Sequence, residues 1–413
     1  VPTQETPTAT VTETAVPTQE TPTATVTETT VPTQEPPTAT VPVIVVPTQE
    51  IPTVTVTATS VPTPKKNTPP GGGGEPAPAA DGIHAIGLTW PDYSTSRSII
   101  DQVEQQLKDD GMNLVALNAG RVEWNFFKWA GNEATWAGSV EDTGIDFLAE
   151  DAARFGKWAH VDAMIDVFAP AYIQAHPEKA AINALGIASP YLVSTVEMVN
   201  GEFSQRLLAM VEYIAANYPV DSISFTELQY RVDGYGPDDT ASYLAYSGNT
   251  DWPRQQNGQI DIDDTSIGDW RSYMIGTLLN KATAIAHKYG KQLFMDVTLN
   301  VNNMTLMANN KGQNYNVMLQ NADKIIVWGY YAEDQYPPET FVQVGQFLST
   351  LGKNKAILSI GLWGPNNTTA SADSVKIAIQ SAQAGGMANL WITPYSMLTS
   401  DHWQVLNQLW SLD

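Results

Sequence analysis

The amino-acid sequence predicts an α/β protein, a (β/α)8 or TIM barrel, preceded by a disordered Thr/Pro-rich repeat segment. Three observations lead to this fold class. Residues 81–413 have the composition of a globular domain, whereas residues 1–80 do not. Within 81–413, eight short apolar segments alternate with amphipathic segments of helical period, which is the pattern of parallel strands joined by helices. Roughly 330 residues for eight βα units is the usual size of such a barrel.

Residues 1–80 form a decaying repeat. The motif Val-Pro-Thr begins at Val1, Val16, Val31, Val46 and Val61, in a background of Thr, Glu, Gln and Ala. Frequent prolines forbid a helix, and the few apolar side chains cannot build a core. We interpret the segment as a disordered linker or stalk, and its Thr/Pro mixture leaves a glycosylated stalk open. Because the chain begins inside a repeat, we expect an upstream module or a surface anchor.

The first four βα units follow in order from residue 83. Their expected strands are apolar on both faces and short, as buried parallel strands are, and they span 83–90, 113–120, 158–168 and 220–230. Between them, apolar residues recur every three or four positions, which predicts helices at 96–111, 144–156 and 202–218. The first of these helices is expected to stop at Gly111, because glycine favours the left-handed conformation that ends helices.

The second half repeats the pattern. A long amphipathic segment at 269–290 is followed by expected strands at 291–300, 322–331, 356–363 and 388–395. A doubly wound sheet is the alternative α/β arrangement. It normally carries a Gly-rich phosphate loop after its first strand, and GLTWPDYSTS at 87–96 is not such a loop. The barrel is therefore the preferred prediction.

Composition excludes several classes of function. The chain has no cysteine, so disulfides, thiol nucleophiles and thiolate zinc sites are excluded. Its net charge of −23 disfavours nucleic acid as a partner, because an acidic surface repels phosphates. No apolar run approaches the length of a membrane span. Motifs for zinc hydrolases, serine hydrolases and phosphate loops are absent, so we expect no metal and no cofactor. The acidic segment 261–270 resembles a calcium loop superficially, but it fits a loop leading into a helix better.

Acidic, amide and aromatic side chains gather at the carboxyl ends of the expected strands, where barrel active sites lie. Aromatic rings pack on the C–H faces of sugars, while carboxylates and amides bind their hydroxyls. We therefore predict a polysaccharide or oligosaccharide substrate. The candidate substrate-binding residues are Trp90, Asp92, Glu123, Trp124, Gln229, Tyr230, Asn300, Trp328, Tyr330, Trp363, Trp391 and Tyr395.

Cleavage of a glycosidic bond needs two carboxylates, one protonated and one ionised. Glu227, at the end of the fourth expected strand, is the candidate general acid, because partial burial raises the pKa of a carboxyl group. Asp296 on the next strand is expected to stay ionised as the base or nucleophile, with Asp166 as the reserve for that role. A structural alternative pairs Glu227 with Arg231 or Arg121.

The segment NYPVDSISFTELQYRVDGYGP, residues 217–237, resembles strand four of glycosyl-hydrolase-like barrels (family-10-like, within the glycoside hydrolase superfamily). Their pattern there is Y-x-VDG-[I/V]-x-FDDY. Asp221 takes the place of the first Asp, while Ser222 replaces the Gly, and Thr226 and Glu227 stand where that group has two acids. The resemblance implies a barrel with carbohydrate-directed activity, in which one of the two acids is retained.

The same strand also resembles that of chitinase-type barrels, which carry DGxDxDxE. Ser224 and Thr226 occupy the positions where those enzymes need Asp, so the resemblance does not extend to their substrate-assisted mechanism. A third group of retaining barrels carries its nucleophilic Glu at the end of strand seven. Here that strand ends in GLWGPNN, without an acid.

We therefore predict a monomeric glycoside hydrolase that is secreted or displayed on the cell surface, typical of an exported bacterial enzyme, and that acts on a polysaccharide. Two alternatives stay open: a barrel that binds carbohydrate without catalysis, and a structural cell-surface protein.

Overall fold

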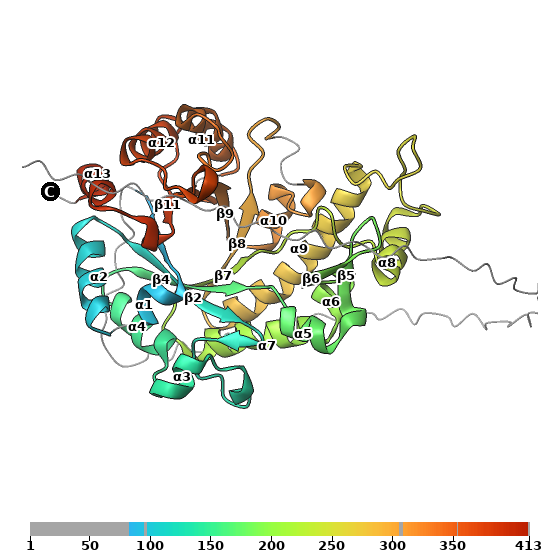
Figure 1. The fold of residues 1–413 in the computed structure, drawn as a ribbon, viewed down its shortest axis with the longest axis horizontal. Coiled ribbons are helices and arrows are strands. Elements are labelled where there is room, and N and C mark those ends of the chain that lie inside the picture. Colours follow the sequence, from blue (N-terminus) through green and yellow to red (C-terminus); the bar gives the residue numbers. More distant parts are fainter. Residues whose placement is uncertain (1–81, 95–96, 305–308, 353, 412–413) are drawn as a thin grey trace, which may run out of the picture. The chain divides into compact units, whose positions relative to one another are not determined.

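A closed barrel of eight parallel strands forms the centre of the protein (Figure 1). The computed structural model describes residues 82–94, 97–304, 309–352 and 354–411, so the expected stalk at 1–80 lies outside the described residues. β1 pairs in parallel with both β2 and β11, which closes the sheet and confirms the predicted barrel. All eight expected strands overlap observed ones: β1 His84–Leu88, β2 Leu114–Arg121, β4 His160–Asp166, β7 Ser222–Thr226, β8 Gln292–Thr298, β9 Lys324–Gly329, β10 Ala356–Gly361 and β11 Leu390–Thr393.

Helices surround the barrel. Four occur where the amphipathic period predicted them: α2 Arg97–Asp109, α4 Phe147–Phe155, α7 Glu202–Asn217 and α9 Thr265–Lys288. The side chain of Asp264 accepts a hydrogen bond from the backbone N–H of Ser266, so the acidic segment 261–270 leads into helix α9 as expected. The remaining helices are α1 Trp90–Ser94, α3 Gly138–Thr143, α5 Pro170–Ala175, α6 Thr195–Asn200, α8 Pro237–Ser247, α10 Tyr315–Asn321, α11 Phe341–Ser349, α12 Ala372–Ala384 and α13 Ser400–Trp410.

Short elements that the sequence pattern did not predict follow the strands. β3 (Trp124–Asn125) folds back antiparallel on the end of β2, and β5 (Ala180–Ile182) pairs with β6 (Ala188–Val193) after β4. The loops that the structure describes also contain 3-10 turns: η1 Glu133–Thr135, η2 Pro177–Lys179, η3 Asn309–Lys311, η4 Pro338–Thr340, η5 Pro365–Asn367 and η6 Tyr395–Met397. These additions enlarge the loops at the carboxyl ends of β2, β4, β8, β9, β10 and β11.

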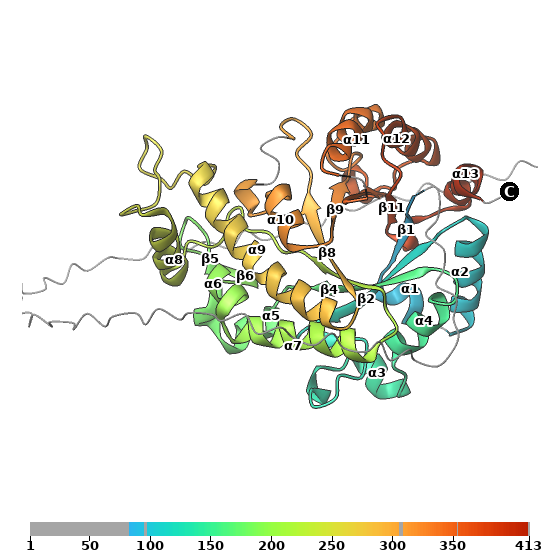
Figure 2. The same ribbon diagram turned by 180° about the vertical axis from the view of Figure 1, so that it is seen from behind.

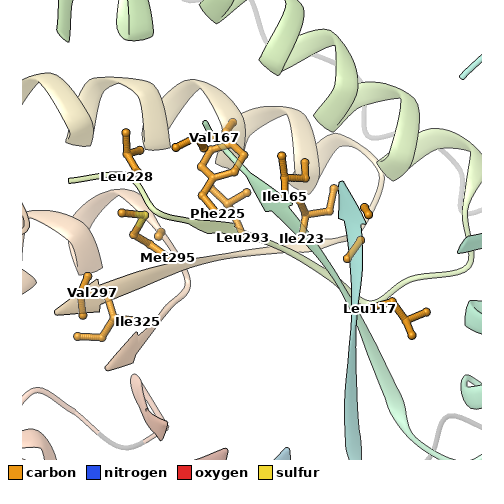
Figure 3. Packing of buried hydrophobic residues seen from close by; sticks show 14 of the residues in the cluster. Leu117, Ile165, Val167, Ile223, Phe225, Leu228, Leu293, Met295, Val297 and Ile325 are labelled. Carbon is orange, nitrogen blue, oxygen red and sulfur yellow. The ribbon is translucent and has the colours of Figure 1, made fainter. Parts of the chain in front are cut away.

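The main hydrophobic core lies between the strands and the helices. Ile165, Ile223, Phe225, Leu293 and Met295 point outward from β4, β7 and β8 and are fully buried (Figure 3). Helices α7 and α9 pack against each other on this side of the barrel (Figures 1 and 2), and α9 covers β8. Because side chains alternate along a strand, the residues between these five face the interior of the barrel.

The interior of the barrel contains a second, smaller apolar cluster. It consists of Ala85, Leu114, Ala116, Phe294, Ile326, Ile357 and Trp391. The β4–β7–β8 side of the interior is polar instead, with Asp162, Ser224 and Asp296 all buried. This is the side on which the candidate site is built. None of the helices in the described part of the chain combines the length and apolar character needed to cross a membrane.

Candidate active site

Three polar residues lie level with one another at or near the carboxyl ends of three neighbouring strands. Asp166 on β4 is the register partner of Thr226 on β7. Phe225 pairs with Met295, so the next residues along, Thr226 and Asp296, also come level. All three alternate with outward-facing residues and therefore face the barrel interior. The structure thus brings two of the predicted acids to either side of Thr226, at the carboxyl ends of the strands.

Glu227 follows Thr226 and leaves the strand by a sharp change of backbone. Its φ is 66°, in the left-handed region that residues other than glycine rarely adopt. An extended residue here would point to the opposite face from Thr226, and the left-handed conformation breaks that alternation. The cost of such a backbone is about 1–2 kcal/mol, and strained residues of this kind cluster at functional sites.

Glu227 is half-buried beside the other acids. Burial raises its pKa, the negative charge of Asp166 raises it further, and the Lys311 ammonium opposes both. The two arginines considered as structural partners of Glu227 bind other acids: Arg121 pairs with Asp166, and Arg231 pairs with Asp263. Within the described residues, no ion pair involves Glu227.

Asp296 is almost completely buried, with 6% of its surface exposed. The indole N–H of Trp328 donates to its Oδ2 at 3.1 Å, while Oδ1 is buried with no hydrogen-bond partner in the described part of the chain. The pKa of Asp296 is raised to about 7, chiefly by burial and also by the charges of Asp162 and Glu227, while the Trp328 indole and the Thr226 hydroxyl act against the increase. We expected an ionised Asp296 from sequence; because few donors stabilise a buried charge, this carboxyl group keeps its proton to a higher pH than a solvated aspartate does.

Asp166 has the partners that Asp296 lacks. Arg121 Nη2 lies 2.7 Å from its Oδ2, and the backbone N–H of Phe168 donates to Oδ1 at 2.8 Å. Burial raises the pKa of Asp166, but the Phe168 N–H and the Arg121 charge counteract that increase. Asp166 is therefore the acid of this group whose ionised form is best supported.

Two further ionisable residues of the site were not among the candidates chosen from the sequence. Asp162 lies fully buried inside the barrel, where Ser222 and Ser224 donate to it at 2.6 and 2.5 Å; burial raises its pKa to about 6. Lys311, in the loop after β8, has its pKa lowered by burial, although Asp334 and Glu227 act in the opposite direction. The inward-facing serines of β7 were a signal for a buried acceptor, whereas nothing local indicated Lys311.

Three of the predicted aromatic residues stand together next to the acids. Trp328 stacks on Tyr330 at 5.5 Å, and Tyr330 contacts Trp363 at 4.9 Å. The Tyr330 ring lies over Gly361, where an added Cβ would come within 2.4 Å of Cδ1. Burial raises the pKa of Tyr330, and Asp296 and Glu227 raise it further, so the ring lies near both. Trp328, Tyr330 and Trp363 form what we call the aromatic wall.

Other predicted residues also lie at the strand ends, several with clear local roles. Glu123 accepts hydrogen bonds from the backbone N–H groups of Ala171 and Tyr172 at the start of α5, at 2.9 and 2.7 Å. Trp124 on β3 is 42% exposed. Asn300, after β8, is exposed and accepts from the backbone N–H of Asn303.

Trp90 and Asp92 belong to α1, just after β1. The Trp90 ring stacks on Phe126 at 3.7 Å, and Asp92 accepts from both the N–H and the hydroxyl of Thr89 at 2.7 Å. Burial raises the pKa of Tyr395, and the charge of Asp92 raises it further, which places these two near each other.

Three remaining candidates follow β7 or lie on β11. Gln229 is half-buried. Tyr230 is fully buried, and its hydroxyl donates to the carbonyl of Val193 at 2.9 Å. Trp391 is 4% exposed and packs over Gly87 inside the barrel. The structure therefore gives Tyr230 and Trp391 packing roles and does not bring them to the group of acids. Among the described residues, no cluster of three or more His, Asp or Glu has the geometry to hold a metal ion.

The sequence matches no protein-family model and no curated protein. Solved structures do match the fold. The PgaB (BpsB) glycoside hydrolase domain from Bordetella bronchiseptica is 13% identical, with a TM-score of 0.59, and the match covers 80% of this chain and 99% of that one. The catalytic domain of beta-amylase from Paenibacillus polymyxa is 12% identical, with a TM-score of 0.56, over 80% and 98% of the two chains.

A beta-galactosidase from the psychrophilic Marinomonas ef1 is 12% identical, with a TM-score of 0.58, over 79% of this chain and 58% of that one. This chain shares its TIM-barrel fold with glycoside hydrolase domains. At such low identity the likeness is one of fold, and function must be argued from the site.

Proposed function

We propose that the barrel is the catalytic domain of a glycoside hydrolase that cleaves O-glycosidic bonds of a polysaccharide. The observation that carries the proposal is the group of acids at the carboxyl ends of β4, β7 and β8, next to the aromatic wall. Glu227, Asp166 and Asp296 meet there in three different electrostatic environments. Acids with separated pKa values are what a proton donor and an ionised partner require.

Glu227 takes the role of general acid in this proposal. Burial and the neighbouring charge of Asp166 raise its pKa, which keeps a proton available for the leaving oxygen. No hydrogen bond to another side chain restrains it in the described part of the chain. The proposed role gives a reason for the strained, left-handed backbone of Glu227. In an extended conformation the strand would turn this carboxyl group away from the interior of the barrel.

Asp166 becomes the ionised partner, in preference to Asp296. Arg121 and the Phe168 N–H stabilise its negative charge directly. Asp296, with a pKa of about 7, would instead serve as a second buried acid beneath the pair. The aromatic wall would pack against the sugar rings that flank the bond, as aromatic side chains do in carbohydrate sites.

We also propose that the protein acts outside the cell as a monomer, where residues 1–80 would space the barrel from a surface or from a neighbouring module. The Thr/Pro repeats and the lack of cysteine support this setting. It is a proposal about the full chain and is independent of the catalytic assignment.

Glu227→Gln tests the catalytic proposal. It preserves the shape of the side chain and removes the acidic proton, so release of reducing ends from polysaccharides should fall at least about a hundredfold. The melting temperature should stay near that of the parent. Turnover close to the parent rate would contradict the assignment, and Asp166→Asn and Asp296→Asn would then identify the acids that act.

A carbohydrate-binding barrel without catalysis is the second candidate. The observation that favours it is the Arg121–Asp166 ion pair, because a carboxylate held this way can be purely structural. Binding of polysaccharides without any release of reducing ends, at high protein concentration and long incubation, would decide for this candidate.

A further inference from the structure

A groove with an apolar floor and a polar rim lies on the outer, helical surface of the barrel, on residues that the candidate active site does not use. It has a volume of about 570 Å³ and is lined by side chains of α8, α9 and α10. In Figure 1 these three helices lie next to one another on one side of the molecule. The lining residues that matter for the argument are Tyr246, Asp269, Tyr273, Asn280, Lys281 and Gln320.

Two tyrosines dominate this groove. Tyr246 of α8 and Tyr273 of α9 stack with ring centroids 5.2 Å apart and planes 29° apart. They are 46% and 54% exposed, so the stack presents a broad apolar surface to solvent. Neither hydroxyl has a hydrogen-bond partner within the described residues. A pair of large rings left open in this way is characteristic of binding surfaces, where tyrosine offers both apolar area and a polar tip.

The floor of the groove depends on a glycine. A Cβ on Gly276 of α9 would come 3.0 Å from Cγ1 of Val317 and 3.0 Å from Nδ2 of Asn321 on α10. Without that Cβ, the two helices approach closely, and Val317 and Gly276 line the groove between them. The floor is therefore a rigid helix–helix contact with an apolar centre.

The rim is polar, and its two charged side chains, Lys281 and Asp269, are hydrogen-bonded to neutral groups. Lys281 donates to the carbonyl of Val199 at 2.8 Å and to Oδ1 of Asn200 at 3.0 Å. Asp269 accepts from Asn309 at 3.0 Å. The amides of Asn280 and Gln320 are exposed and make no hydrogen bond in the described part of the chain. The groove thus offers stacked rings and exposed amides, and its rim carries one lysine and one aspartate of opposite charge, which suits an uncharged, hydroxyl-rich ligand.

We propose that this groove binds a segment of a neutral polysaccharide chain, at a site separate from the acids of the barrel. The Tyr246–Tyr273 stack would carry the sugar ring, and the side-chain amides of Asn280 and Gln320 would bind its hydroxyls. The inference rests on the proposed function only for the chemical class of ligand, since a non-catalytic barrel could use the same groove. A phosphate-bearing ligand is disfavoured by the net charge of −23.

The test uses the full chain carrying Glu227→Gln, so that bound polymer is not consumed. Migration in native gels is compared with and without hydroxyethylcellulose, xylan, galactan, mixed-linkage β-glucan or glycol chitin. Tyr246→Ala/Tyr273→Ala should weaken the dissociation constant for the retarding polymer about tenfold, the scale expected from losing two ring contacts. Tyr246→Phe/Tyr273→Phe keeps the stack and should retain most of the binding.

Ile377→Ala on α12 is the matched control, because Ile377 is a similarly exposed apolar residue outside the groove. It should bind like the parent. Equal binding by the double alanine variant and the control would overturn the inference, as would a parent that no polymer retards.

The outcome is separable from that of the proposed function. In the chain with native Glu227, the double alanine variant should hydrolyse short soluble oligosaccharides at the parent rate and the polymer more slowly. If the parent hydrolyses no substrate but the double alanine variant still loses binding, the binding proposal is supported and the catalytic proposal is contradicted. If the parent hydrolyses substrate and the double alanine variant binds polymer as the parent does, the catalytic proposal is supported and the binding proposal is contradicted.

Discussion

The indole N–H of Trp328 on β9 donates to Oδ2 of Asp296 on β8 at 3.1 Å, across two neighbouring strands. The same ring stacks on Tyr330, so one side chain joins the buried acid to the aromatic wall. This donor favours the ionised form of Asp296 and opposes the burial that raises its pKa to about 7. The protonation state of Asp296 and the position of the wall are therefore coupled.

Trp328→Phe should remove this coupling while keeping a ring in the stack. Asp296 then loses the indole donor, and its pKa should rise from about 7 to a higher value. The free energy of unfolding should fall by about 1–3 kcal/mol at pH 8, where the wild-type carboxylate is ionised, and by less at pH 5. Urea unfolding at both pH values measures this. An equal loss at both would mean that only packing was lost.

Asp296→Asn should stabilise the protein at alkaline pH. The folded-state pKa of about 7 lies above the ordinary value of 3.8, so the folded chain holds a proton that the unfolded chain has lost. Stability from this group is present at low pH and disappears as the pH rises from about 4 to above 7. The variant should therefore gain on the order of 3 kcal/mol at pH 8 and little at pH 4.

The control for that measurement is Asp142→Asn, at an exposed aspartate of α3. This variant removes a carboxyl group from the surface and so provides the baseline against which Asp296→Asn is compared. A flat pH dependence for Asp296→Asn would show that the Asp296 carboxyl group is not held protonated by burial.

Glu227→Gly and Glu227→Ala separate the backbone role of Glu227 from its side-chain role. Both remove the carboxyl group, so both should abolish hydrolysis. Glycine adopts a φ of 66° without strain, whereas alanine keeps its Cβ, so the glycine variant should be more stable by about 1 kcal/mol. Thermal unfolding of the two variants measures the difference.

Gln335 provides the reference for this comparison, because its φ is 60° and its side chain is exposed. At position 335 too, the glycine variant should be more stable than the alanine variant, because of the backbone conformation alone. If alanine at position 227 is as stable as glycine, the residue relaxes out of the left-handed region, and its strain has no functional meaning.

Arg121→Met tests whether Asp166 is the ionised acid. The guanidinium lies 2.7 Å from Asp166 Oδ2 and holds down a pKa that burial raises. Without it, Asp166 should protonate at higher pH, and the acidic limb of the pH–rate profile should move up by about one unit or more. Arg121→Lys keeps the charge and should move the limb less. If the acidic limb of the pH–rate profile does not move, Asp296 and not Asp166 is the ionised acid.

The strands and the main helices were predictable because their signals are local. The apolar run at 220–230, for example, indicates a buried strand without reference to any other segment, and it places Glu227 at a strand end. Eight such runs imply a barrel, and the barrel implies a shared rim. The candidate acids and the aromatic wall were found by this route.

The environment of each acid was decided by tertiary structure alone. The Arg121–Asp166 ion pair and the Trp328–Asp296 hydrogen bond both depend on the register of neighbouring strands and on which loop folds over them. Lys311 lies in a loop after β8, and Tyr246 of one helix contacts Tyr273 of another. No repeat or motif in the sequence predicts either contact. Periodicity along a chain records which face of an element is buried. It carries no information on which distant side chain shares that face, and pKa values and binding surfaces depend on those neighbours.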